Sequence, residues 1–142
     1  MTMSPSLAEL VARYAADYGI PGDGAAELRR EVMVLFAAGA LTAPADKVVA
    51  AEILVDSDQL AQVDAAQSLA LAAMAQDRRG RLLAATAYDR LRRLRGQPQK
   101  FGTQVDEDGE VAALWPVDPA TTDSERAKWD VPPLAELRQR LQ

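Results

Sequence analysis

The sequence predicts a mostly α-helical domain: an irregular helical bundle with one short β-hairpin near residues 101–117 and short C-terminal helices after it. Ala supplies much of the 49% apolar content and only 5% of the residues are aromatic, which favours close helix packing because Ala combines high helix propensity with little bulk. Apolar residues recur at helical spacing up to residue 95, and the pattern then changes. With 142 residues the chain has the length of a single domain, with a helical body (1–95) and a loop, hairpin and C-terminal cap (96–142).

The first two helices are predicted over residues 5–18 and about 23–38, where apolar side chains repeat on one face of a 3.6-residue period. Ser4 is a suitable N-cap for the first helix. Gly19 and Gly39 follow the last periodic residues and are expected to end the two helices.

Three more helices are predicted over about residues 44–55, 58–76 and 81–95. The first of them is apolar nearly all round in its second half, so we expect it to be buried. Asp56-Ser57-Asp58 separates it from the next helix, and Gly96 is the expected residue after the last. The last two resemble one helical hairpin of the tetratricopeptide or Sel1 kind, but no second copy recurs at a fixed period, so we do not predict a solenoid.

A β-hairpin is predicted where residues 101–105 and 110–117 flank Asp106-Glu107-Asp108-Gly109, because Asp-Gly is a strong turn signal. A lone hairpin is marginally stable in water, so we expect it to pack on the helical body. Two short helices should follow, from about 123 to 129 and from 134 to 141.

The chain contains no Cys and no His. Their absence excludes disulfides, Cys nucleophiles, Ser-His-Asp triads and metal sites made from thiolates or imidazoles, so we predict no metal site and no cofactor. Acid–base chemistry would have to use the remaining side chains, chiefly Asp, Glu, Lys and Tyr.

Neither a signal peptide nor a stretch of about 18 apolar residues is present, so we expect a cytoplasmic protein without a membrane partner. An apolar face left uncovered on either of the first two helices would indicate a homodimer.

The net charge of −5 hides a basic block at residues 77–100, with 8 bases and 2 acids, between two acidic segments. These Arg residues do not share one helical face, and no aromatic residues alternate with them for base stacking. We therefore do not expect nucleic-acid binding, and we predict a solvated helix that faces acidic tails.

The segment between the helices and the hairpin is the main candidate site, and it reads Gly96-Gln97-Pro98-Gln99-Lys100-Phe101-Gly102-Thr103-Gln104. Glycines let a backbone approach a ligand closely, and the amides and the hydroxyl suit a polar ligand. The same residues also suit a helix C-cap that leads into a strand, with Gln and Thr bonded to the local backbone. The residues alone leave both interpretations open.

This segment resembles the signature Gly-x-Pro-Gln-[Lys/Arg]-[Phe/Tyr]-Gly-Thr-Gln of an uncharacterised bacterial family of domains of unknown function. The resemblance covers roughly residues 60–137 and also includes Asp89-Arg90, Pro116 to Pro119, Arg126 and Pro132-Pro133-Leu134. Many relatives have Gly where Asp130 stands and paired Arg where Glu125-Arg126 stands, and some have a His that this chain lacks. The family has no established activity, so the resemblance implies a site without naming its chemistry.

We expect the residues around this segment to converge on a ligand. Arg90 would hold an anion, and Gln99, Thr103 and Gln104 would supply amide and hydroxyl contacts. Trp115 and Trp129 would form an apolar wall, and Asp89 and Asp118 are the candidate acid–base carboxylates. The first hypothesis is a binding or accessory module for a small polar or anionic molecule or a peptide segment. The alternative is a small cofactor-independent enzyme that uses Asp89 or Asp118 as acid or base.

Overall fold

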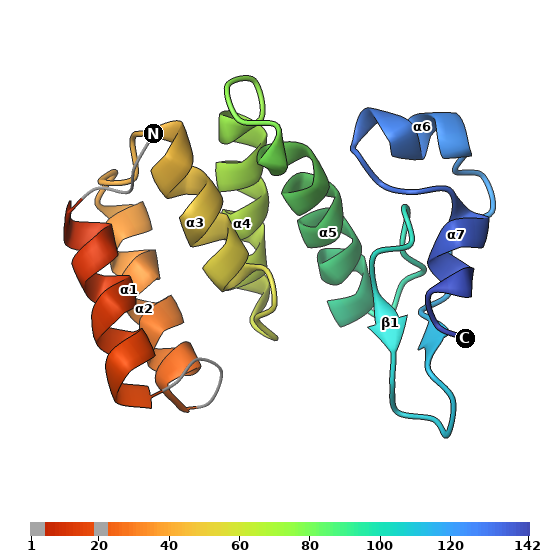
Figure 1. Ribbon diagram of the computed structural model, residues 1–142, viewed down its shortest axis with the longest axis horizontal. Helices are drawn as coiled ribbons and strands as arrows, with labels where there is room; N and C mark the ends of the chain where they lie inside the picture. The colour runs from red at the N-terminus through yellow and green to blue at the C-terminus, as the bar shows by residue number, and fades with distance from the viewer. Residues whose placement is uncertain (1–4, 19–22) are drawn as a thin grey trace.

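The computed structural model describes residues 5–18 and 23–142 (Figure 1). In chain order its elements are α1 (Pro5–Tyr18), α2 (Asp23–Ala37), α3 (Pro44–Leu54), α4 (Leu60–Ala73), α5 (Arg79–Leu94), β1 (Val105–Asp106), β2 (Ala113–Leu114), α6 (Asp123–Lys128) and α7 (Leu134–Gln139). The predicted fold class, mostly helical with one small hairpin, is confirmed. The expected N-cap Ser4 and helix end Gly19 lie outside the described residues.

The helices follow one another along the long axis of the molecule, with α1 and α2 at one end and α6 and α7 at the other (Figure 1). α3, α4 and α5 pack side by side in the middle. None of the helices within residues 5–18 and 23–142 combines the length and the apolarity needed to cross a membrane.

The main core extends from α1 to α5 and combines Leu and Val side chains with many Ala residues. Small residues fill the interface of α4 and α5, where Ala66, Ala70, Ala84 and Ala87 are buried. α3 is buried along most of its length, as its composition predicted. Burial of Ala brings helix axes close together, because so little side chain separates the two backbones.

A second apolar cluster lies on the other side of α5 and attaches the C-terminal part of the chain. Phe101 and Val131 are buried there against Ala85, and Tyr88 and Trp129 pack beside them. α5 therefore contacts the helical body with one face and the C-terminal cap with the other.

The hairpin is shorter than predicted. Only two residue pairs form the ladder, Val105 with Leu114 and Asp106 with Ala113, whereas the sequence predicted a first strand from residue 101. The backbone N–H groups of residues 100–103 donate to the carboxylate of Asp89, so they are not available to a neighbouring strand.

Gly80 sits in the first turn of α5, against the backbone of α4. A Cβ at this position would lie 2.7 Å from the carbonyl oxygen of Ala70 and 2.9 Å from the Cα of Met74. Both are backbone or near-backbone atoms, so neither can move aside without separating the two helices.

We expect Gly80→Ala to lower the free energy of unfolding by about 1–2 kcal/mol, because overpacking outweighs the gain in helix propensity. Urea denaturation measures this change. Gly109→Ala is the matched control, since a Cβ there would make only an ordinary 3.7 Å contact, and it should stay within about 0.5 kcal/mol. Equal stability of the two variants would contradict the close approach of α4 and α5.

Candidate functional site

The 96–104 segment, called the 96–104 loop below, is built around the carboxylate of Asp89. Oδ1 accepts the backbone N–H groups of Lys100 and Phe101 at 2.8 and 2.9 Å. Oδ2 accepts the N–H groups of Gly102 and Thr103, both at 3.1 Å, and the Thr103 hydroxyl at 2.7 Å. Asp89 is completely buried, so this one side chain replaces water for four successive backbone donors.

Gln99 closes the loop from its other end. Its Nε2 donates to the carbonyl oxygens of Gln104 and Trp115, and its Oε1 accepts the N–H of Gln104 at 2.7 Å. The backbone of Gln99 also pairs with the chain near Val117. Gln99 is fully buried and both ends of its amide are bonded inside the protein.

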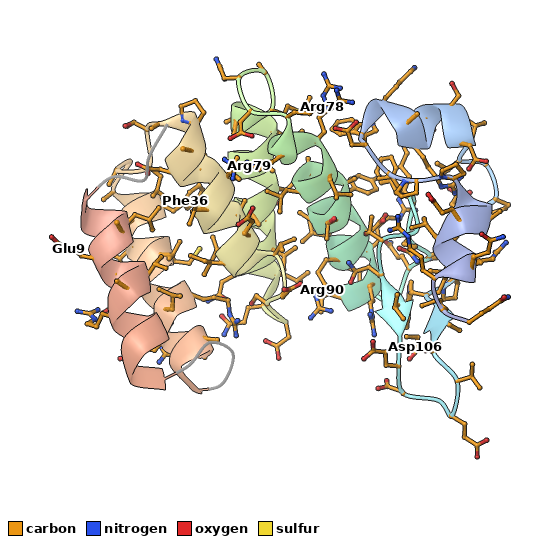
Figure 2. The ribbon with its side chains drawn as sticks, viewed as in Figure 1. Glu9, Phe36, Arg78, Arg79, Arg90 and Asp106 are labelled. Carbon is orange, nitrogen blue, oxygen red and sulfur yellow. The ribbon has the colours of Figure 1, made fainter. Side chains whose placement is uncertain are left out.

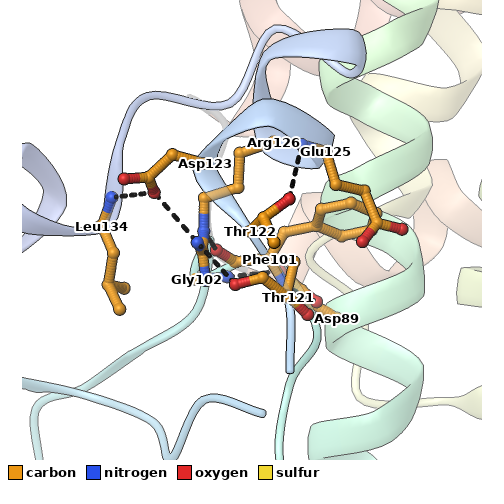
Figure 3. Close-up of polar contacts among 9 residues, drawn as sticks. All are labelled: Asp89, Phe101, Gly102, Thr121, Thr122, Asp123, Glu125, Arg126 and Leu134. Atoms are coloured by element: carbon orange, nitrogen blue, oxygen red, sulfur yellow. Dashed lines mark hydrogen bonds and ion pairs between the residues drawn. The ribbon is translucent and has the colours of Figure 1, made fainter. Parts of the chain in front are cut away.

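Arg126 reaches the same loop from α6 (Figure 3). Its Nε donates to the carbonyl oxygen of Phe101 at 2.6 Å, and Nη1 donates to the carbonyl oxygen of Thr121 and to Asp123. Only 2% of the residue is exposed. Within the described part of the chain, Nη2 has no hydrogen-bond partner. Arg126 thus links α6 to the backbone that Asp89 holds from α5.

Two glycines allow the loop to take this path. Gly96 has a φ of +71°, as expected just after a helix end. Gly102 has a φ of +113°, and a Cβ there would lie 3.0 Å from Cδ1 of Leu137 in α7. Gly102 is therefore required both for backbone conformation and for the close packing of α7.

Four of the predicted site residues come together in this loop. Asp89 accepts the backbone N–H and the hydroxyl of Thr103, and the side-chain amide of Gln99 bonds to the backbone of Gln104. The side-chain amide of Gln104 makes no hydrogen bond with the described residues, although only 8% of the residue is exposed.

Trp115 lies beside this cluster and contributes to the attachment of the hairpin. Its carbonyl accepts from Gln99, and its Nε1 donates to the carbonyl oxygen of Gln97 at 2.8 Å. The guanidinium of Arg93 lies over the Trp115 ring, 5.2 Å from its centroid, and also donates to the carbonyl oxygen of Val105.

The side chains of Arg90 and Asp118 bond outside this cluster, although the backbone N–H of Asp118 donates to the carbonyl oxygen of Gln99 at 2.8 Å. Arg90 donates to the carbonyl oxygens of Ser57 and Asp56 in the α3–α4 connection, and Figure 2 shows it on that side of α5. Burial, and then the nearby charge of Arg93, lower the pKa of the Arg90 guanidinium below its ordinary value. Asp118 accepts the N–H of Ala120 within its own turn.

Most of the basic block is paired within the molecule. Arg78 binds Asp130, Arg79 binds Asp77, Lys100 binds Glu125, and Arg90, Arg92 and Arg93 donate to backbone carbonyl oxygens. Among the described residues, the side chains of Arg81 and Arg95 make no hydrogen bond or ion pair. The three ion pairs neutralise Arg78, Arg79 and Lys100, whereas the bonds to carbonyl oxygens fix Arg90, Arg92 and Arg93 in place without removing their charge.

The outer side of the loop borders two adjoining hollows on α4 and α5. The first, the aromatic hollow, has a volume of about 230 Å³ and is lined by Gln67, Leu71, Ala84, Ala85, Tyr88, Lys100, Phe101 and Trp129. The second, the polar hollow, has a volume of about 180 Å³ and is lined by Asp64, Gln67, Tyr88, Leu91, Arg92, Arg95 and Gln97. They share Gln67 and Tyr88, so they form one continuous groove.

Lys100 stands at the rim of the aromatic hollow. Its ammonium lies 5.8 Å from the ring centroid of Tyr88 and 5.5 Å from that of Phe101, and it binds Glu125 at 2.8 Å. The hydrogen bond to Glu125 raises the pKa of Lys100 above its ordinary value in spite of partial desolvation. The two opposite charges leave this rim with no net charge.

The sequence predicts the 96–104 loop and Trp129 at a ligand site, but not the α4 and α5 residues that line this groove. A signal was present, because Asp64, Gln67 and Leu71 follow i, i+3, i+7 spacing on α4, and Tyr88, Arg92 and Arg95 follow i, i+4, i+7 spacing on α5. Each set forms a stripe on its helix. The sequence does not show that these two stripes line the same groove, because this depends on how α4 and α5 pack against each other.

A larger groove of about 530 Å³ crosses α1 and α2 at the far end of the molecule, where Figure 2 labels Glu9. Its lining includes Val34, which is 68% exposed. This groove shares no residue with the 96–104 loop. Among the described residues, no group of three or more acidic side chains is arranged to hold a metal ion.

Comparisons of the chain with protein-family models, with curated proteins and with solved structures found no match. The resemblance of the 96–104 loop to a family signature therefore stays a prediction.

We expect Asp89→Asn to lower the free energy of unfolding by about 3–5 kcal/mol, because the new NH₂ group would face backbone N–H donors in a buried site. Urea denaturation at pH 7 measures the loss. Asp118→Asn is the control, since its carboxylate bonds only within an exposed turn, and it should cost less than about 1 kcal/mol. Similar values for the two variants would mean that Asp89 does not organise the loop.

The carboxyl group of Asp123 makes the free energy of unfolding depend on pH under acidic conditions. The N–H of Leu134, and then Arg126, hold the pKa of Asp123 below its ordinary value of 3.8, despite an opposing contribution from desolvation. A carboxyl whose pKa is lower in the folded state adds stability above pH 3.8, and this stability is lost as the pH falls through the folded-state pKa.

We therefore expect Asp123→Asn to lower the melting temperature by a constant amount between pH 7 and 5, and by less as the pH falls below 3.8. Thermal denaturation across this range tests the sign. Asp123→Ala, which also loses the bond to Leu134, should be less stable than Asp123→Asn at pH 7. A difference from wild type that grows in acid would contradict the assignment.

Proposed function

We propose that the protein is a binding or accessory module that holds a small polar or anionic ligand, or a peptide segment, against the outer side of the 96–104 loop. The observation that carries this proposal is the groove formed by the aromatic and polar hollows, to which the loop contributes Gln97, Lys100 and Phe101. Ligand sites of this kind combine apolar walls with a few polar groups on a rigid support.

The rigid support comes from the inner side of the loop. Asp89, Gln99 and Arg126 together bond to the backbone of five residues between Lys100 and Gln104. Residues held in this way do not need to be ordered when a ligand arrives, which lowers the entropy cost of binding. In this proposal, the amide group predicted as a ligand contact (Gln99) and the carboxylate predicted as an acid or base (Asp89) serve as the scaffold of the site.

The free cationic groups lie on the outer side. Arg95 is exposed and has no side-chain partner among the described residues, and Nη2 of Arg92 is likewise free, while its Nε and Nη1 bind Pro98 and Tyr88. An anionic group of a ligand would therefore meet two guanidinium groups with unused donors.

The enzyme alternative has less support. Five donors already point at the two oxygens of Asp89, so no lone pair remains to accept a proton from a substrate. Asp118 lines neither hollow of the groove, and its carboxylate bonds within its own turn.

A cytoplasmic location and a bacterial origin remain expectations from the sequence. A homodimer has one supporting feature, the exposed Val34 in the groove across α1 and α2, whose lining is half apolar and half charged.

We expect Arg95→Ala to leave the melting temperature of the free protein unchanged and to weaken ligand binding about tenfold. The reason is that the Arg95 side chain is exposed and that only the ligand would contact it. The measurement is a thermal-shift screen with small anions, polar metabolite-like compounds and short peptides, followed by titration of each hit. Lys128→Ala is the matched control, since it removes an exposed cation from α6 outside both hollows. A confirmed ligand that binds Arg95→Ala as tightly as wild type would rule out the proposed groove.

A further inference from the structure

The polar hollow is lined by charged groups of both signs that are not paired with each other. Asp64 comes from α4, and Arg92 and Arg95 come from α5. In the described residues no ion pair or hydrogen bond joins Asp64 to either Arg, and Asp64 has no other partner. One carboxylate and two guanidinium groups thus face the same volume of about 180 Å³ with free acceptors and donors.

The adjoining aromatic hollow suits an uncharged, apolar group. Tyr88, Phe101 and Trp129 supply its aromatic walls, and Leu71 on α4 leaves 43% of its surface exposed. Lys100 and Glu125 neutralise each other at the rim. Its volume of about 230 Å³ is sufficient for one large apolar side chain.

The two hollows share Gln67 and Tyr88, so a single small molecule can place groups in both. That molecule needs one negative group for the Arg pair, one positive group for Asp64, and an apolar group close to both charges. A simple anion would contact only the Arg pair, and it would use neither Asp64 nor the aromatic hollow. An internal peptide segment carries neither terminal charge.

We infer that the ligand is a free α-amino acid with a large apolar or aromatic side chain. Its carboxylate binds Arg92 and Arg95, its ammonium group binds Asp64, and its side chain occupies the aromatic hollow. This inference rests on the proposed function and specifies the ligand class of the same groove. It accounts for every unpaired charged group in the lining of the polar hollow.

Isothermal titration of the full chain with L-phenylalanine tests the inference. We expect saturable binding, and we expect N-acetyl-L-phenylalanine, L-phenylalaninamide and L-serine each to bind at least about tenfold more weakly, since each lacks one of the three groups. Asp64→Asn should weaken phenylalanine binding and bring its Kd towards that of N-acetyl-L-phenylalanine. Arg95→Ala should bring the Kd for phenylalanine towards that of L-phenylalaninamide, and Lys128→Ala should leave the Kd for phenylalanine unchanged.

Two results would overturn the inference. If N-acetyl-L-phenylalanine binds as tightly as phenylalanine, the ligand is an apolar carboxylate and Asp64 has no part in recognition. If neither phenylalanine nor leucine binds, the class is wrong. In both cases the wider thermal-shift screen tests the proposed function separately. If that screen finds another ligand whose binding depends on Arg95, the groove remains the binding site and only the inferred ligand class is wrong.

Discussion

The bond between one buried carboxylate and four successive backbone N–H groups determines how the C-terminal third of this protein is arranged. Asp89 belongs to α5, and the groups that it accepts belong to the loop that follows the helix. Removing this carboxylate would leave several buried donors without water or a partner, and each such donor costs roughly 1–3 kcal/mol. The loop therefore keeps its path only because a side chain on the preceding helix substitutes for a strand or a second helix.

This arrangement gives the two sides of the loop different roles. The inner side is bonded by Asp89, Gln99 and Arg126, so the backbone N–H groups of residues 100–104 already have partners. On the outer side, Lys100 and Phe101 line the aromatic hollow together with residues of α4 and α5. The small side chains of Ala84 and Ala85 on α5 occupy too little volume to fill this hollow. A rigid loop opposite small helical residues leaves a hollow, because neither partner can move to close it.

The sequence predicted the helices well because their apolar residues follow a 3.6-residue period, which reports the buried face directly. It also predicted that Asp89, Gln99 and Thr103 belong to one cluster, but it left open whether they serve a ligand or the fold. The path of Arg90 was not predictable, because its position at the edge of the buried stripe allows contact with either neighbour, and tertiary packing turned it to the carbonyl of Ser57. The short hairpin had a similar cause, since a single side chain took the donors that strand propensity assigned to the ladder.

Asp130 shows how a residue other than Gly is accommodated just after α6. It has a φ of +56°, a left-handed conformation that Gly adopts without strain and most other residues avoid. Its two carboxylate oxygens accept both Nε and Nη2 of Arg78, each at 2.8 Å, and this contact lowers the pKa of Asp130. The ion pair is open to solvent, with 75% of the Arg78 side chain exposed, so its contribution is small and offsets a backbone cost that is itself modest for Asp. Asp130 thus holds the left-handed turn after α6, and this turn leads the chain to Val131, which is buried in the cluster around Phe101.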